Sequence, residues 1–482
     1  MNYLEKFKSI YENYSWCWLD TEYLVDTHLI ANAVVYLNEV FSHKSYELNS
    51  KKQTFHNREI YKYLKNNKQD KDIAFSSIKN FSGNVIVQAG LHPVSEVPNP
   101  IECTRTHFID KFLSDDIVLE KMRNGTMTLF LYQGWEAEDF TNSKLSYPTK
   151  FDKYNSLYEM FKSVLDDYQL PKKSIVIISS NLYGNDIKKD YGVNIIYDNC
   201  MEMNSFIGRA SSEDKRYKMD YDYSIDEYLE NVKTSDKVIC RLSRTKDTQR
   251  DFMLYYIYRL KWLDKSLIEH KFFNNNHLNN NSLYDLAKEF CMKNDELKYL
   301  AKYFDKVRDT KILDKINKDL PFTASDIEKH KSFVPQTIHS NLPIPYDVYK
   351  KTIFSWVSTS LPDRKDMIFL NQSTFNPILH YHPILWLSYP NTAKYFKQCG
   401  YKSYDWLFES ESKIDNSEFF HERFVYNLHE IYKLMNMSRD ELYNKLKDNK
   451  DVLVHNRNLL LECKSIERII TKLYGVLNET KI

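Results

Sequence analysis

A group of cations in the middle of the chain has the residue types and spacing of a phosphate-binding site. Its four members are Arg241, Arg244, Lys246 and Arg250. They span the end of an expected strand over residues 237–242 and the first turn of an expected helix over 248–262. Ligands of open α/β sheets bind at the carboxyl ends of strands, and guanidinium groups beside a helix N-terminus suit a pyrophosphate. A solvated loop held by salt bridges is the alternative, and the spacing leaves both interpretations open.

Glycine usage limits how a nucleotide could be held. The chain has nine glycines, and the closest pair is Gly83 and Gly90. A G-x-G-x-x-G turn or a P-loop needs glycines within a few residues of one another, so that backbone N–H groups can approach phosphate. Both motifs are therefore excluded, and side chains with helix N-termini would have to bind any nucleotide.

Two side chains in the first half could act as a general base. His92 follows an expected strand over 84–88, and Glu136 follows an expected strand over 127–132. An imidazole or a carboxylate at the carboxyl end of a strand can deprotonate a hydroxyl group of a substrate. The simpler interpretation of each is a solvated loop residue.

The elements that would position these residues alternate between strand and helix. Short apolar runs that end at loops predict buried strands, and a stripe of apolar residues predicts a helix over 154–168. The remaining expected elements are strands over 174–180, 193–197, 367–370 and 383–387 and a helix over 391–400 with Asn391 as its cap. This alternation predicts an α/β fold with two Rossmann-like domains.

The expected domain limits follow from these elements. Residues 1–230 should form the first domain, with a helical leader over about the first eighty residues, and residues 231–415 the second. Residues 416–482 should be helical, because Ser438 and Glu441 form a capping box and an apolar stripe precedes them. We expect these last helices to be able to pack back against the first domain.

Composition and charge exclude several classes of protein. The 482 residues are 42% hydrophobic and carry a formal net charge of +1, so the overall field does not attract nucleic acid or anionic membranes. No apolar stretch reaches the roughly 20 residues of a membrane span, and the first residues lack a signal-peptide layout. Seven dispersed cysteines without a C-x-x-C pair argue against disulfides and structural zinc. We therefore expect a cytoplasmic protein without a membrane segment.

No metal site is expected either. His380 and His382 have no third ligand nearby, and Asp220-Tyr221-Asp222 follows no apolar strand of the kind that precedes a D-x-D metal motif.

Several motifs resemble a glycosyltransferase-like family that is common in large tailed bacteriophages. Leu242-Ser243-Arg244, Arg250 and residues 262–267 are similar to a family pattern of Leu-Asn-Arg, a second Arg and Leu-Asp-Lys-Gly-Leu. Residues 371–378 are similar to Thr-Glu-Lys-Thr-Phe-Lys-Pro-Ile, and residues 400–404 to a Gly-Phe-Lys-Thr-Phe pattern. The similarity covers roughly residues 125 to 460 and is more specific in the C-terminal half.

The resemblance implies a GT-B arrangement, in which two Rossmann-like domains face a cleft and the second holds a nucleotide-sugar donor. It implies that Arg244, Arg250, Gln372 and Thr374 line that cleft as donor contacts. Acidic residues are usual in the loop of Glu136, which favours this residue over His92 as the base.

The chain also departs from the family pattern. Gln372 and Ser373 replace a Glu-Lys pair, Asn376 replaces a Lys, and Thr359 stands where an acidic residue is usual. These changes remove charge that would stabilise a departing nucleotide, so Arg244 and Arg250 would carry more of that role.

The predicted function is therefore a phage-type glycosyltransferase in the cytoplasm of an infected bacterial cell. It would move a sugar from a nucleotide-sugar to an unidentified acceptor, which could be modified DNA, a protein or a glycan. The alternative is a non-catalytic GT-B-like phage protein with a structural or host-interaction role.

Overall fold

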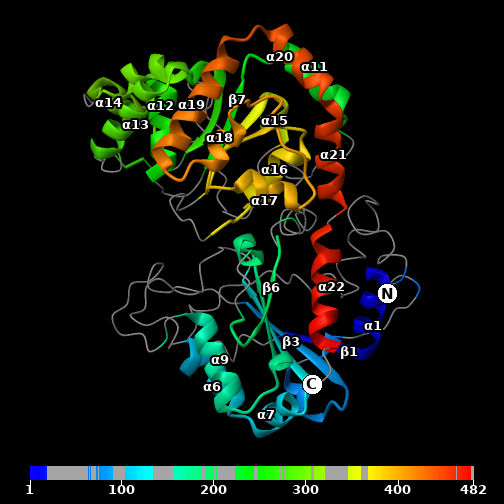
Figure 1. The fold of residues 1–482 in the computed structure, drawn as a ribbon. Coiled ribbons are helices and arrows are strands. Elements are labelled where there is room, and N and C mark those ends of the chain that lie inside the picture. Colours follow the sequence, from blue (N-terminus) through cyan, green and yellow to red (C-terminus); the bar gives the residue numbers. More distant parts are fainter. Residues whose placement is uncertain are drawn as a thin grey trace. The chain divides into compact units, whose positions relative to one another are not determined.

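The computed structural model describes residues 1–18, 72–90, 104–133, 154–199, 223–243, 248–320, 346–359, 367–462 and 464–478, apart from a few positions inside these ranges, with isolated residues such as Glu202. The chain forms two compact units, one of Met1–Asn204 with Glu462–Ile482 and one of Ser205–Leu461. Each unit contains one parallel β-sheet surrounded mostly by helices (Figure 1). The expected α/β class with two parallel sheets is confirmed.

The first unit is built on a six-stranded sheet with the order β2-β1-β3-β4-β5-β6. Its strands are β1 (Tyr14–Trp18), β2 (Asp72–Ile73), β3 (Asn84–Gly90), β4 (Met127–Gln133), β5 (Ile175–Ser179) and β6 (Asn194–Tyr197). Its helices include α1 (Tyr3–Asn13), α6 (Asp110–Leu113), α7 (Asp116–Arg123), α9 (Leu157–Asp167) and α22 (Lys464–Asn478). The strands expected over 84–88, 127–132, 174–180 and 193–197 are thus confirmed.

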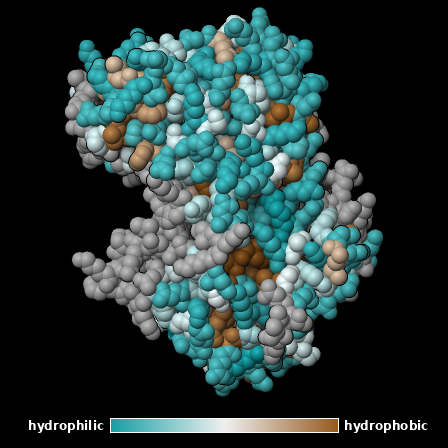
Figure 2. Space-filling model, viewed as in Figure 1, coloured by the Kyte–Doolittle hydropathy of each residue, from teal (hydrophilic) through white to brown (hydrophobic). Residues whose placement is uncertain are grey.

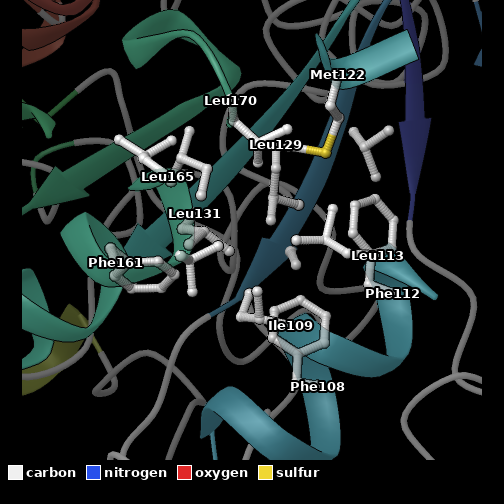
Figure 3. Packing of buried hydrophobic residues seen from close by; sticks show 14 of the residues in the cluster. Phe108, Ile109, Phe112, Leu113, Met122, Leu129, Leu131, Phe161, Leu165 and Leu170 are labelled. Atoms are coloured by element: carbon white, nitrogen blue, oxygen red, sulfur yellow. The ribbon is translucent and has the colours of Figure 1, made fainter. Parts of the chain in front are cut away.

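The main core of this unit lies between one face of the sheet and helices α6, α7 and α9. Alternate residues of β4, Leu129 and Leu131, are fully buried there. Phe161 and Leu165 of α9 pack onto them, as does Met122 of α7, and Figure 3 shows these side chains meeting over the strand. Because side chains alternate across a strand, the neighbouring residues such as Phe130 are left for the opposite face.

Helix α22 belongs to the first unit although more than 260 residues separate it from the sheet strand that it contacts. It packs against α1 and along β6, and Figure 1 shows the two helices side by side. Arg468 binds both carboxylate oxygens of the buried Asp198 at 2.9–3.1 Å, and Lys472 lies 3.4 Å from the same carboxylate. The backbone N–H of Ser465 donates to Glu202, which is also buried. Ion pairs therefore fix the start of α22 at the carboxyl end of β6.

The second unit is built on a four-stranded sheet with the order β10-β9-β7-β8. Its strands are β7 (Ile239–Ser243), β8 (Ser266–His270), β9 (Phe354–Ser358) and β10 (Ile384–Leu387). Its α-helices include α11 (Ile225–Thr234), α12 (Thr248–Arg259), α13 (Asn281–Lys293), α14 (Thr310–Asp319), α15 (Tyr346–Lys350), α16 (Gln372–Leu379), α17 (Thr392–Gln398), α18 (Glu411–Asn416), α19 (Phe420–Asn436), α20 (Arg439–Asp448) and α21 (Lys450–Leu461). The helices expected after residue 416 and the capping box of Ser438 and Glu441 are present.

Contacts of α11 explain where the units divide. The sequence suggests a boundary near residue 230, whereas the compact units divide after Asn204. Helix α11 packs with α20 and α21, and the hydroxyl of Tyr228 donates to the carbonyl of Ile353 at 2.7 Å. These contacts place residues 225–234 in the second unit.

The structure contradicts one prediction of secondary structure and part of another. Residues 367–370 are buried but form no strand, because a short apolar run indicates burial without showing whether its backbone pairs. The first eighty residues, expected to be helical, contain α1 but also contribute β1 and β2 to the sheet, and the aromatic run of β1 favours a strand.

The N-terminus of α17 is capped by a distant residue. Asn391 holds the expected cap position, with φ of 65°, but its side chain makes no capping hydrogen bond. The carboxylate of Asp415 accepts from the backbone N–H groups of Ala393 and Lys394 at 2.7 and 3.0 Å instead. Helix α17 ends as expected, with Gly400 following at φ of 99°, a conformation that suits glycine.

A buried carboxyl group beside this cap has an unusual protonation state. Glu411 accepts a hydrogen bond from the backbone N–H of Tyr404 at 3.1 Å and is 5% exposed. Burial is the main reason that its pKa rises from 4.5 to about 7, and nearby Asp405 and Asp415 add to the effect. The folded protein therefore holds this proton at pH values at which the unfolded chain releases it.

Glu411→Gln should change how stability depends on pH. Between about pH 4.5 and pH 7 the wild type should lose up to about 3 kcal/mol as pH rises, because the unfolded chain binds fewer protons at this site. The variant keeps an acceptor for Tyr404 and should lack this loss, so it should be the more stable protein at pH 8 and equal to wild type at pH 4. Chemical denaturation across this pH range measures the difference.

Glu409→Gln is the matched control for this prediction. Glu409 is exposed, and its partner Lys433 lowers its pKa, so its substitution should not reproduce the effect. Burial lowers the pKa of His382 to about 4, so this residue makes stability rise with pH. Its contribution is the same in wild type and in Glu411→Gln, and it cancels when the two stability curves are subtracted. Parallel stability curves for wild type and Glu411→Gln would contradict the prediction.

One face of the second unit is mainly hydrophilic. On the face in Figure 2, hydrophilic residues dominate the second unit and hydrophobic ones are scattered. Within the part of the chain that the structure covers, no helix has the length and apolar character needed to cross a bilayer.

Candidate functional site

The strand order of the second unit places a topological switch point between β7 and β9. After β7 the chain adds β8 on one side, and β9 and β10 then follow on the other side. The carboxyl ends of the two strands at this point are Ser243 and Ser358. Open α/β sheets bind ligands in the crevice outside such a point, because the connections diverge there.

Arg250 lies at this switch point. It belongs to the first turn of α12, the helix that follows β7, and it is 7% exposed. Its Nε donates a hydrogen bond to the Oγ of Ser358 at 3.3 Å. The preceding Gln249 donates from its side chain to the carbonyl of Thr359. A guanidinium group and a helix N-terminus thus meet the carboxyl end of β9.

A chain of buried polar groups lies beside Arg250. Nη1 of Arg241, in β7, is 3.0 Å from Nδ1 of His270, at the end of β8. The other ring nitrogen of His270 is 2.9 Å from Oδ1 of Asp251, in α12. Arg241 also donates from Nη2 to the backbone carbonyl of Arg250 at 2.8 Å. Each of these side chains is at most 2% exposed, so they form a polar network inside the unit.

A small pocket lies on the opposite face of β7 and β9, where α16 covers the sheet. It has about 240 Å³ of empty space and is lined by Cys240, Leu242, Tyr349, Ser355, Trp356, Val357, Ser373 and Pro377. The first turn of α16 therefore reaches the same switch point from the other face.

The structure places some of the predicted donor residues. Thr374 lies in α16 and is fully buried, and its hydroxyl makes no hydrogen bond to the described part of the chain. Gln372 is the first residue of α16, but its side chain lies outside the described residues. Arg244, which follows β7, lies outside them as well. A single cleft lined by all four donor residues stays a prediction.

The two candidate bases, His92 and Glu136, also lie outside the described residues. The strands that precede them, β3 and β4, are neighbours in the first sheet and end at Gly90 and Gln133. The expected strands are thus in place, while the roles of the two side chains stay predictions.

The departures from the family pattern have defined surroundings. Thr359 is buried, and its hydroxyl is 2.9 Å from the hydroxyl of Ser388, the residue after β10. Asn376 is buried in α16. A threonine therefore completes a hydroxyl pair between two strand ends, where the family has an acidic residue.

Sequence reasoning missed His270, Asp251 and Ser358. The strands that end at His270 and Ser358 were not expected, so no argument linked those residues to a sheet edge. Asp251 follows Arg250 directly and has the form of an ordinary first-turn acid. A signal was present in the polar residues Glu269 and His270, which close a run of strand-forming residues.

The histidines near α16 have structural partners. His382 is buried, with Nδ1 3.1 Å from the hydroxyl of Ser355 and Nε2 2.7 Å from the carbonyl of Tyr349. The ring of His380 stacks on that of Tyr349 at 4.5 Å. Among the residues the structure covers, no three His, Cys, Asp or Glu side chains are grouped as metal ligands. The Asp220-Tyr221-Asp222 segment lies outside them.

No family model, curated protein or solved structure matches this chain. The functional interpretation therefore depends on the residues and their geometry.

Proposed function

We propose that this protein is a phage-type glycosyltransferase of the GT-B kind that binds a nucleotide-sugar donor with its second unit. The observation that carries the proposal is the position of Arg250, whose guanidinium reaches Ser358 at the switch point between β7 and β9. This is where open α/β sheets bind ligands, and it is where the sequence motifs independently suggest donor contacts.

The charge at this point suits a nucleoside diphosphate. Arg250 carries a permanent positive charge, and the N-terminus of α12 adds the positive end of a helix dipole. Charge develops on the diphosphate when a sugar leaves, and a cation fixed at that position stabilises the transition state. Arg250 would supply this charge together with Arg244, while Gln372 would bind a neutral group of the donor.

The acceptor would bind to the first unit. Its sheet has the same order at its start, β2-β1-β3-β4, so a second switch point lies between β1 and β3. Glu136 or His92, each of which follows a strand of this sheet in the sequence, would remove the proton from the acceptor hydroxyl. The acceptor itself could be modified DNA, a protein or a glycan.

A ligand screen tests the proposal directly. Thermal unfolding should be measured with UDP, GDP, CMP and dTDP sugars. A donor present at one hundred times its dissociation constant should stabilise the protein by about 2.7 kcal/mol. If none of these donors stabilises wild type, and Gln372→Glu with Ser373→Lys does not create binding, the non-catalytic alternative is the better interpretation.

A further inference from the structure

We infer that the hydrogen-bonded side chains of Arg241, His270 and Asp251 form a positioning network that holds Arg250 at the switch point. This inference rests on the proposed function in one respect, since it assigns the network to the proposed donor site. The four residues come from β7, β8 and the first turn of α12, so the network joins two strands to the helix that carries Arg250.

The hydrogen-bond directions in the network follow from the chemistry of its ends. An arginine guanidinium only donates, so Nδ1 of His270 must accept from Arg241. Nε2 of His270 then carries the proton and donates to Oδ1 of Asp251. The other oxygen of Asp251 accepts from the backbone N–H of Asn274 at 3.2 Å. His270 is therefore neutral, because a proton on Nδ1 would face an N–H of Arg241.

These bonds control where Arg250 lies. Arg241 donates a hydrogen bond to the carbonyl of Arg250. Asp251, the next residue of the helix, is bound to His270 of β8. On the other side, Gln249 binds the end of β9. Three consecutive residues of the first turn are thus attached to three strands, which sets the direction in which the Arg250 side chain leaves the helix.

Burial makes the network sensitive to a single change. Arg241, His270 and Asp251 are 1%, 2% and 1% exposed, so water cannot readily replace a lost partner. The charges of Arg241 and Asp251 balance through the neutral ring between them. Altering one acceptor should therefore shift the first turn of α12 and leave the strands in place.

Asp251→Asn is the sharpest test, because it keeps the shape and changes one acceptor into a donor. The single oxygen of the introduced amide can accept a hydrogen bond from His270 or from the backbone N–H of Asn274, but not from both. The other partner would then face the NH₂ group of the amide. We expect the Nε–H of Arg250, which donates to Ser358, to exchange with solvent at least roughly tenfold faster in the variant. NMR of arginine-labelled protein measures this rate, and Arg250→Lys identifies the signal.

Asp319→Asn is the matched control. Asp319 is also buried, and it accepts from the hydroxyl of Tyr258 near the other end of α12. The control should leave the Arg250 signal unchanged. If Asp251→Asn lowers stability but leaves the exchange of the Arg250 Nε–H unchanged, the network is only structural and the inference is wrong.

The affinity for UDP and inorganic pyrophosphate separates this inference from the proposed function. Asp251→Asn should weaken both affinities roughly tenfold. If wild type binds neither these probes nor any donor of the ligand screen, the proposed function fails, while the exchange rate of the Arg250 Nε–H still decides the positioning role. If Asp251→Asn does not fold, nitrogen NMR of the wild-type ring decides instead, since a proton on Nδ1 of His270 would overturn the inference.

Discussion

Arg250→Ala is expected to slow sugar transfer, or hydrolysis of the donor, about a hundredfold. Removing one well-placed charged donor from a poorly hydrated site leaves the developing charge of the diphosphate without its partner. The fold should persist, because the hydrogen bond from Arg241 to the backbone carbonyl of Arg250 remains when the Arg250 side chain is removed. Single-turnover rates with the donor found in the ligand screen measure the effect.

Arg259→Ala is the control on the same helix. Arg259 lies at the far end of α12, where it donates to the hydroxyl of Tyr255. Its loss should leave the rate within a factor of a few, whereas Arg244→Ala should reduce it about as much as Arg250→Ala. An active wild type that is indifferent to both Arg244→Ala and Arg250→Ala would keep the enzyme and refute this donor site.

Arg468→Ala should destabilise the first unit by about 3 kcal/mol. Asp198 has a side chain that is 3% exposed, and Arg468 provides its closest ion pair, at 2.9 Å. Lys472 would still lie 3.4 Å from this carboxylate after the loss of Arg468, which is a longer contact than the one removed. Chemical denaturation, followed by a probe in the first unit, measures the loss.

Lys162→Ala is a suitable comparison for this prediction. Lys162 and Asp166 also form an ion pair within the first unit, but both side chains are more than half exposed. Such pairs contribute less than about 1 kcal/mol, so this variant should unfold almost like wild type. Equal effects of the two substitutions would show that the buried contact at Asp198 adds no special stability.

Local patterns in the sequence predicted several of the regular elements. The stripe over 154–168 and the run over 174–180 correspond to α9 and β5, since amphipathic helices and continuous apolar strands leave clear periodic signals. The stripe from Phe420 to Met435 corresponds to α19, and its residues are buried as expected. These features depend on near neighbours in sequence.

What the sequence could not predict depends on partners far away. The cap of α17 comes from Asp415, more than twenty residues along the chain, although Asn391 is in the usual position. The bond between Arg250 and Ser358 spans 108 residues, and it required a strand that no local signal had indicated. The predicted strand over 237–242 was enough to place Arg250 near a strand end. Its contacts with Ser358 and Arg241 became known only from the fold.

The return of α22 to the first unit also affects the order in which the protein can fold during synthesis. The carboxylate of Asp198 leaves the ribosome some 270 residues before Arg468. Residues 205–461, which form the second unit, are complete before the helix that finishes the first unit has been made. Domains usually fold in the order of their synthesis. Here the second unit can reach its native state first, at a time when the first sheet still lacks its last helix and the ion pair that this helix makes with the buried Asp198.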